Sequence, residues 1–203
     1  ADRYAERTCV FAWELWNESS CIKIKNDRIK VLKEWHSYML SRLHKMFPNH
    51  MVVISLPSYD NNNTRNNVYP ALNADPQNDV TQVHNYLNEG RALPICVQPT
   101  DVLCADAVNS MLKLTPEKPV LFAEVGAASP NHSAGPSKYY EKDSQGLFLH
   151  DQTFTPFFLG SAGTGMSWHW EYYVQKHNLW YVFGRFSRAV KGIDPIKENF
   201  VPK

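Results

Sequence analysis

Short apolar runs alternate with longer amphipathic stretches along the chain, and this alternation predicts strands separated by helices. The predicted strands are residues 9–13, 51–56, 79–87, 120–126 and 163–173. The predicted helices are residues 26–47, 100–114, 146–159 and 179–190. Strands that alternate with helices in this way favour an α/β fold built on parallel strands.

Two predicted elements show the periodic spacing of their residues most clearly. In the first predicted helix, apolar side chains recur at every third or fourth position; either Asn26 or Asp27 is placed to cap it, and Pro48 ends it. The strand at residues 79–87 alternates with a period of two, which puts His84 and Tyr86 on one face.

The loops that follow strands are longer than the others. Residues 57–79 and 126–144 are both long and polar, and each follows a predicted strand. In β/α folds the functional residues lie on the loops at the C-terminal ends of the strands. The functional site is therefore expected at that end of the molecule.

Charge narrows the class of partner. The chain has 21 basic and 20 acidic residues, a formal net charge of +1, so nucleic acid and anionic membrane surfaces are not expected as partners. No run of about 18 apolar residues predicts a membrane-spanning helix. The six Trp, ten Tyr and ten Phe fit either a well-filled core or a cleft that stacks on sugar rings, and composition leaves both readings open.

The four cysteines form no CxxC pair and have no metal-type spacing with histidine. We therefore expect four free thiols and no metal site. Cys9 falls in the first predicted strand, where a buried, small apolar role is the common one.

Residues able to do chemistry stand at the ends of four predicted strands, namely Asn17, Glu18, His84, Tyr86, Glu124, Trp168 and Trp170. Parallel strands would bring these side chains to one rim, with Glu18 facing Glu124 across a cleft. Two opposed carboxyl groups suit hydrolysis of a glycosidic bond, in which one stays protonated and the other stays ionised. The plainer alternative is a structural ion pair. Glu14 lies deeper in its strand, and we expect it to pair with a buried arginine.

Four motifs in this order, "WELWNES", "VHNY", "PVLFAEVG" and "GMSWHW", resemble strands four, six, seven and eight of a clan A glycoside hydrolase. The nearest resemblance is to the family 5 cellulases and mannanases. It implies a TIM (β/α)8 barrel of ~250 residues, of which residues 1–203 would supply strands four to eight as the C-terminal portion of a single catalytic domain. Strands one to three are expected to come from a missing N-terminal barrel segment or from a second chain.

The resemblance also implies roles for the matching residues. Glu18 would be the general acid/base and Glu124 the nucleophile. Asn17 would hydrogen-bond the sugar 2-hydroxyl, Tyr86 would donate to the nucleophile, and His84 would lie close to the acid/base or the substrate. For His84 and Tyr86, an ordinary place in the core is the alternative.

Either Trp168 or Trp170 would form the platform under the sugar, and the sequence does not choose between them. His150 and Asp151, which could suggest a catalytic pair, fall on a predicted helix and are interpreted as helix-surface residues.

The predicted function is that of a retaining β-glycoside hydrolase acting on a β-linked polysaccharide or oligosaccharide, without cofactor or metal. Such an enzyme is expected to be secreted or periplasmic. A carbohydrate-binding protein or inactive fragment that keeps the sugar cleft is the first alternative. A β/α domain that binds phosphate or nucleotides is disfavoured, because no glycine-rich phosphate loop follows a strand.

Overall fold

A computed structural model describes residues 3–25, 27–90, 93–130 and 137–200 of the chain. Its strands are β1 (Ala12–Glu14), β2 (Met51–Val53), β3 (Thr81–Leu87) and β4 (Val120–Ala127). β1 pairs with β2 and β3 with β4, both in parallel, and a single parallel bridge from Val53 to Val80 joins the two pairs. Neighbouring strands therefore follow the order of the chain, as in a barrel, rather than reversing as in a doubly wound sheet.

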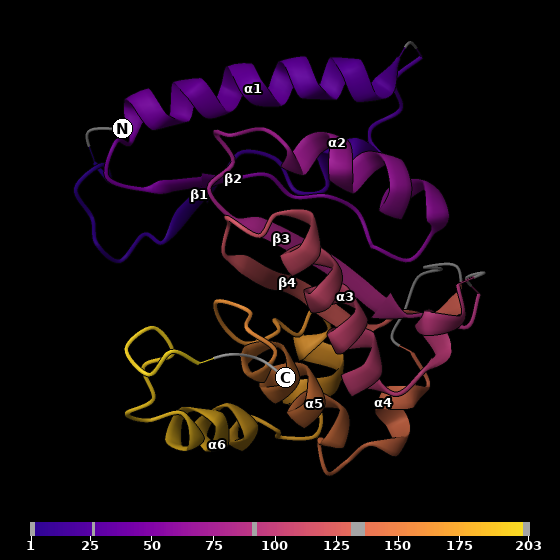
Figure 1. The fold of residues 1–203 in the computed structure, drawn as a ribbon. Helices are drawn as coiled ribbons and strands as arrows, with labels where there is room; N and C mark the ends of the chain where they lie inside the picture. Colours follow the sequence, from indigo (N-terminus) through magenta and orange to yellow (C-terminus); the bar gives the residue numbers. More distant parts are fainter. Residues whose placement is uncertain (1–2, 26, 91–92, 131–136, 201–203) are drawn as a thin grey trace.

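Helices connect the strands and cover one side of them (Figure 1). They are α1 (Arg28–Met46), α2 (Tyr69–Asn73), α3 (Thr100–Leu114), α4 (Tyr139–Lys142), α5 (Leu147–Phe158) and α6 (Tyr181–Ala189). Shorter helical turns are η1 (Ser19–Cys21), η2 (Thr64–Val68), η3 (Pro94–Val97) and η5 (Trp170–Gln175). Helix α1 packs on β2, α3 packs on β3 and β4, and α5 packs on α3.

Local signals in the sequence set several of these ends. The Asp27 carboxylate accepts a hydrogen bond of 3.2 Å from the Lys30 amide, so Asp27 caps α1 as predicted. The predicted bounds of the helix at residues 100–114 are confirmed without change. At the start of α5, Asp143 accepts hydrogen bonds from the first amides of the helix, those of Leu147 and Phe148.

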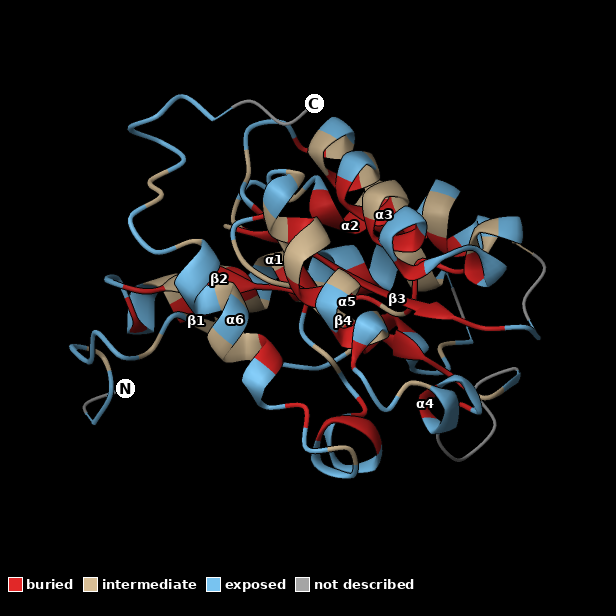
Figure 2. Ribbon diagram, turned by 90° about the horizontal axis from the view of Figure 1, so that it is seen from below, coloured by how far each residue is buried: buried red, intermediate tan, exposed pale blue. Residues whose placement is uncertain are grey.

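The apolar core lies between the strands and the helices. Every residue of β3 is buried, whereas α1 and α3 carry both buried and exposed residues (Figure 2). A second apolar cluster forms where α5 and α6 meet the turn at residues 170–175, and it includes Tyr140, Leu149 and Tyr173. These clusters fix the positions of the strand ends on which the candidate site stands.

Three predicted strands differ clearly from the structure, and the one predicted at residues 51–56 ends at Val53. The first begins at Ala12 rather than Cys9, and Cys9 is exposed rather than buried. The segment at residues 163–173 contributes only one bridge, from Ser167 to Val125, and then enters the helical turn at Trp170. The alternating pattern there was misleading because the backbone of His169 leaves the extended conformation, with φ −88° and ψ 51°.

All four cysteines are free thiols, as predicted. Among the described residues, no helix is both long and apolar enough to cross a lipid bilayer.

Candidate active site

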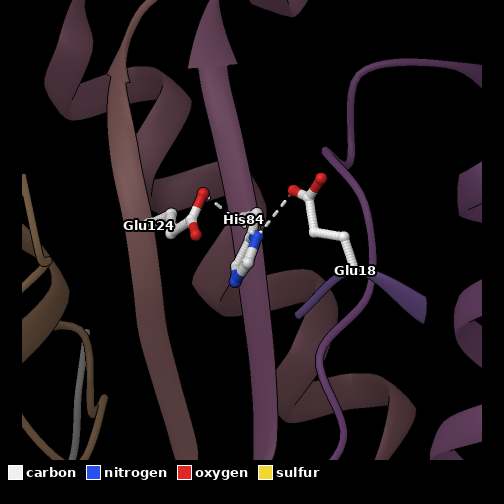
Figure 3. Close-up of side chains that lie close together, drawn as sticks. All are labelled: Glu18, His84 and Glu124. Carbon is white, nitrogen blue, oxygen red and sulfur yellow. Dashed lines mark hydrogen bonds and ion pairs between the residues drawn. The ribbon is translucent and has the colours of Figure 1, made fainter. Parts of the chain in front are cut away.

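Glu18, His84 and Glu124 meet at one place, with Glu18 beyond the end of β1 and the other two within β3 and β4 (Figure 3). Nδ1 of His84 lies 2.8 Å from Oε1 of Glu18 and 3.3 Å from Oε2 of Glu124. The His84 side chain is 2% exposed, whereas those of Glu18 and Glu124 are 26% and 17% exposed. The imidazole is thus enclosed, and both carboxyl groups remain partly open to a ligand.

An irregularity in the strand pairing puts Glu124 next to His84. Val83 pairs with Phe122, but His84 pairs with Glu124, so β4 carries one extra residue, Ala123, at this point. Side chains alternate along a strand, and one additional residue reverses their direction from that point on. The extra residue therefore turns Glu124 toward the face that His84 occupies.

Tyr86 holds the carboxyl group of Glu124 from the other side. Its hydroxyl donates a hydrogen bond of 2.5 Å to Oε2 of Glu124. Burial and the neighbouring Glu124 charge raise the pKa of Tyr86 well above its usual range, so the hydroxyl stays protonated and acts as a donor.

Burial also raises the pKa of Glu124, and the Glu18 charge adds to that increase. His84 and the Tyr86 hydroxyl act in the opposite direction and favour the ionised form. Glu124 is thus a partly buried carboxyl group whose charge depends on two named donors.

Glu18 lies just beyond β1, in a backbone conformation that residues other than glycine rarely adopt, with φ 49° and ψ 49°. Its amide donates to Oγ of Ser55 at 2.9 Å, and Ser55 donates to Oδ1 of Asn17 at 3.0 Å. Asn17 is therefore next to the acidic pair, and its side chain is held by a serine that the sequence interpretation did not single out.

Glu14 has a different partner from the one expected. Its carboxylate accepts a hydrogen bond from the side-chain amide of Gln82 on β3, not from an arginine. Glu14 is the last residue of β1 and is exposed as a residue, although partial burial of its carboxyl group raises the pKa. Gln82 shares a face of β3 with His84, which is why it can reach the same rim.

The two tryptophans flank His169 and are about half exposed, at 52% for Trp168 and 50% for Trp170. The Trp168 amide donates to the carbonyl of Val125, the residue after Glu124, at 3.1 Å. Trp170 instead begins the helical turn η5. The main chain therefore ties Trp168, rather than Trp170, to the strand that carries Glu124.

A tyrosine that the sequence did not indicate supports this segment. The Tyr140 hydroxyl accepts a hydrogen bond from the Ala127 amide at 2.7 Å and lies 3.0 Å from Nδ1 of His169. Gly126 leaves room for them, because a Cβ there would lie 2.8 Å from the Tyr140 oxygen and 3.2 Å from Nδ1 of His169. His150 and Asp151 are part of α5, pair with each other at 3.2 Å, and do not reach this site.

Glu18, His84 and Glu124 also form the group whose donors could hold a metal ion in the part of the chain that the structure describes, with one atom of each within 4.8 Å of the others. His84 lies between the two carboxyl groups and can donate a proton to either. The same three residues therefore fit acid–base chemistry without a cation between them.

A match to a protein-family model identifies the family of this chain. A model described as "Cellulase (glycosyl hydrolase family 5)" matches residues 1–148, which is most of the chain and includes Glu18, His84 and Glu124. The chain belongs to glycosyl hydrolase family 5. Trp168 and Trp170 lie beyond the matched residues. No curated protein matches the chain.

Solved structures show the fold of this family 5 chain. An endo-β-1,4-mannanase from Thermotoga petrophila is 22% identical, with a TM-score of 0.50; the match covers 81% of this chain and 36% of that one. The hyperthermostable endo-1,4-β-D-mannanase from Thermotoga petrophila RKU-1, solved with maltose and glycerol, is 21% identical, with a TM-score of 0.53; that match covers 81% and 47%. The chain thus spans less than half the length of either protein.

Proposed function

We propose that the protein containing this chain is a retaining β-glycoside hydrolase that cleaves β-linked polysaccharides or oligosaccharides. The observation that carries the proposal is the approach of Glu18 and Glu124, which present carboxyl oxygens within 4.8 Å of each other on either side of His84. Retaining glycosidases use carboxyl groups about 5–5.5 Å apart, whereas inverting ones need about 6.5–9.5 Å for an intervening water. The 4.8 Å limit joins carboxyl oxygens and not carboxyl carbons, so it supports the shorter spacing without measuring it, and direct attack by one carboxylate is the proposed route.

Glu124 is the proposed nucleophile, because Tyr86 and His84 stabilise its ionised form. Its carboxylate attacks the anomeric carbon and forms a glycosyl ester, while Glu18 gives its proton to the leaving oxygen. Glu18 then takes a proton from water, which displaces Glu124 from the sugar. The substrate and one water are consumed, and both carboxyl groups return to their starting states.

Asn17 is proposed to bind the sugar 2-hydroxyl, and Trp168 is the proposed platform under the sugar because its amide is bonded to the residue after Glu124. The solved neighbours are named endo-β-1,4-mannanases, so β-1,4-linked mannan and manno-oligosaccharides are the first substrates to test.

We also propose that further strands extend the sheet beyond β1 and complete a barrel. Phe11, Leu15 and Trp16, on either side of β1, are 58%, 43% and 53% exposed. Large apolar side chains exposed at both ends of an edge strand fit a surface that another element covers.

Two substitutions in the protein containing this chain test the function. Glu124→Gln should lower turnover by several orders of magnitude but leave oligosaccharide binding within a few-fold, because the shape of the site is kept. Glu18→Ala should abolish cleavage of substrates whose leaving group needs a proton, while an aryl glycoside with an acidic phenol still forms the glycosyl ester.

Azide distinguishes the two roles. Added to Glu18→Ala, it should restore turnover of the aryl glycoside and give a product with retained β configuration. An α product would mean that azide attacked where the nucleophile is placed, and the two roles would be exchanged. Full activity in both variants would remove both residues from the chemistry, and binding without turnover in the unaltered protein would favour a carbohydrate-binding protein.

A further inference from the structure

The direction of the Glu18 carboxyl group depends on a strained stretch of backbone. Its φ and ψ values, both 49°, lie in the left-handed region, which an L-residue with a side chain occupies only when its surroundings enforce it. The carboxyl group itself has few contacts in the described part of the chain, namely Nδ1 of His84 at 2.8 Å and a weak contact with the Cys21 thiol at 3.7 Å. The direction of the Glu18 side chain therefore depends largely on the contacts that hold its main chain in place.

Ser55 holds the main chain on one side. It lies two residues beyond β2 and is fully buried. Its hydroxyl oxygen accepts the Glu18 amide at 2.9 Å, and its proton goes to Oδ1 of Asn17 at 3.0 Å. One hydroxyl group thus uses both its donor and an acceptor position to fix two consecutive residues of the site.

Ser19 and His36 hold the main chain of Glu18 on the other side. Ser19 is fully buried, and its Oγ lies 2.8 Å from Nε2 of His36, a 3% exposed residue of α1. Burial lowers the pKa of His36 to about 4, so the ring is neutral at the pH at which most enzymes work. Glu18 therefore lies between a hydrogen bond to the β2 segment and, through the next residue, a hydrogen bond to helix α1.

We propose that Ser55 and the Ser19–His36 pair are positioning residues that keep Glu18 in its left-handed conformation and aim its carboxyl group at the bond to be cleaved. This inference rests on the proposed function, in which Glu18 is the general acid. If the Ser55 hydroxyl only satisfied a buried amide, its loss would lower the rate equally for every substrate. A positioning hydroxyl has a narrower effect, because it matters only when the leaving group needs a proton.

The test compares Ser55→Ala in the protein containing this chain with the unaltered protein on two substrates. One is a β-linked oligosaccharide whose cleavage depends on protonation of the leaving group; the other is an aryl β-glycoside with an acidic phenol. The measured quantity is kcat/KM, which reports the glycosylation step. Both substrates share any loss that comes through Asn17, so we expect kcat/KM to fall about 10- to 100-fold further for the oligosaccharide than for the aryl glycoside.

Ser58→Ala is the matched control. Ser58 lies three residues further along the same segment and is 8% exposed, and its hydroxyl has no hydrogen-bond partner among the described residues. This control should change neither rate. Ser19→Ala, which removes the opposite hydrogen bond, should show the same preference between substrates as Ser55→Ala, and it replaces that variant if Ser55→Ala does not fold.

An equal loss on both substrates, an unchanged oligosaccharide rate, or the same effect from Ser58→Ala would each overturn the inference. Glu18→Ala, measured in parallel, separates this failure from a failure of the proposed function. If Glu18→Ala loses the oligosaccharide reaction and Ser55→Ala does not, only the positioning role is wrong. If Glu18→Ala keeps the oligosaccharide reaction, the acid itself has been misassigned.

Discussion

The Tyr86 hydroxyl lies 2.5 Å from Oε2 of Glu124, and the two side chains come from adjacent parallel strands, β3 and β4. The hydrogen bond lowers the pKa of a carboxyl group that burial would otherwise raise further. The ionisation of Glu124 is therefore controlled from the neighbouring strand.

Tyr86→Phe should raise the pKa of Glu124, because it removes a donor to the ionised form. A nucleophile must be ionised, so the acidic limb of kcat/KM against pH should move to higher pH, with a loss of roughly 10- to 100-fold at the optimum. Tyr181→Phe, which removes a hydroxyl that donates to the Gln145 carbonyl on the surface, is the control. An acidic limb that stays in place would show that Tyr86 does not tune the nucleophile.

Glu124→Gln should stabilise the fold at neutral pH. Because burial raises the pKa of Glu124 above its ordinary value of 4.5, the folded state binds more protons than the unfolded state at pH values above 4.5. The free energy of unfolding then falls as the pH rises above 4.5, and below that pH the burial of Glu124 carries no such cost. The gain in Tm on substitution should be near zero at about pH 4 and grow toward pH 7, at about 2–4 °C per kcal/mol. A gain independent of pH would contradict this account.

Gly126→Ala should damage both stability and activity. The new Cβ would lie 2.8 Å from the Tyr140 oxygen and 3.3 Å from Cδ1 of Tyr86, which would have to move. Overpacking of this kind costs about 1–3 kcal/mol. Gly163→Ala is the control, since its Cβ would meet only Leu121, at an ordinary 3.8 Å. Thermal unfolding and kcat/KM measured on both variants distinguish crowding at Gly126 from a general effect of alanine.

The rate at which a thiol reagent labels Cys21 should depend on the charge of Glu18, and this can be measured without an activity assay. Burial, followed by the Glu18 charge, raises the pKa of Cys21 from 9.0 to about 11, which lowers its thiolate fraction at pH 8 roughly 100-fold. Exposed Cys9 should therefore react with a thiol reagent well before exposed Cys21, and buried Cys104 only after unfolding. Glu18→Ala should speed the labelling of Cys21 and leave the rate at Cys9 unchanged. Equal acceleration at both would indicate loosening of the fold.

Trp168→Ala should weaken oligosaccharide binding about tenfold or more, through loss of the stacking area. Trp170→Ala should have a smaller effect, because η5 carries that residue away from the Val125 hydrogen bond. Titration of the inactive Glu124→Gln variant measures both affinities without hydrolysis. The reverse order would make Trp170 the platform.

Much of the fold could be predicted because local signals and burial agreed. The helix at residues 100–114 follows a proline and has apolar residues at helical spacing, and its bounds are those of α3. The strand predicted at residues 163–173 was too long because an alternating pattern records side-chain polarity and not the path of the main chain. The segment bonds to β4 through Met166 and Trp168, and its main chain then turns at His169.

The candidate site was predictable as a set of residues but not as a geometry. Strand ends in a parallel fold meet, which is enough to bring Glu18 and Glu124 together. The place of His84 between them depends on the pairing irregularity after Val83, and no residue type marks that irregularity. The sequence does not indicate Ser55 for a similar reason. A serine near the end of a strand is common, and its role arises only from the left-handed turn at Glu18.

The extra residue in β4 lets the strand change its length at one point without moving Glu124. Replacing Ala123 by another small residue keeps the residue count, and Glu124 stays beside His84. Deleting Ala123 would restore regular pairing and still leave Glu124 opposite His84, because Phe122 already lies opposite Val83. A deletion at this position is therefore better tolerated than one elsewhere in β4, where a lost residue would turn the side chains that follow it to the other face.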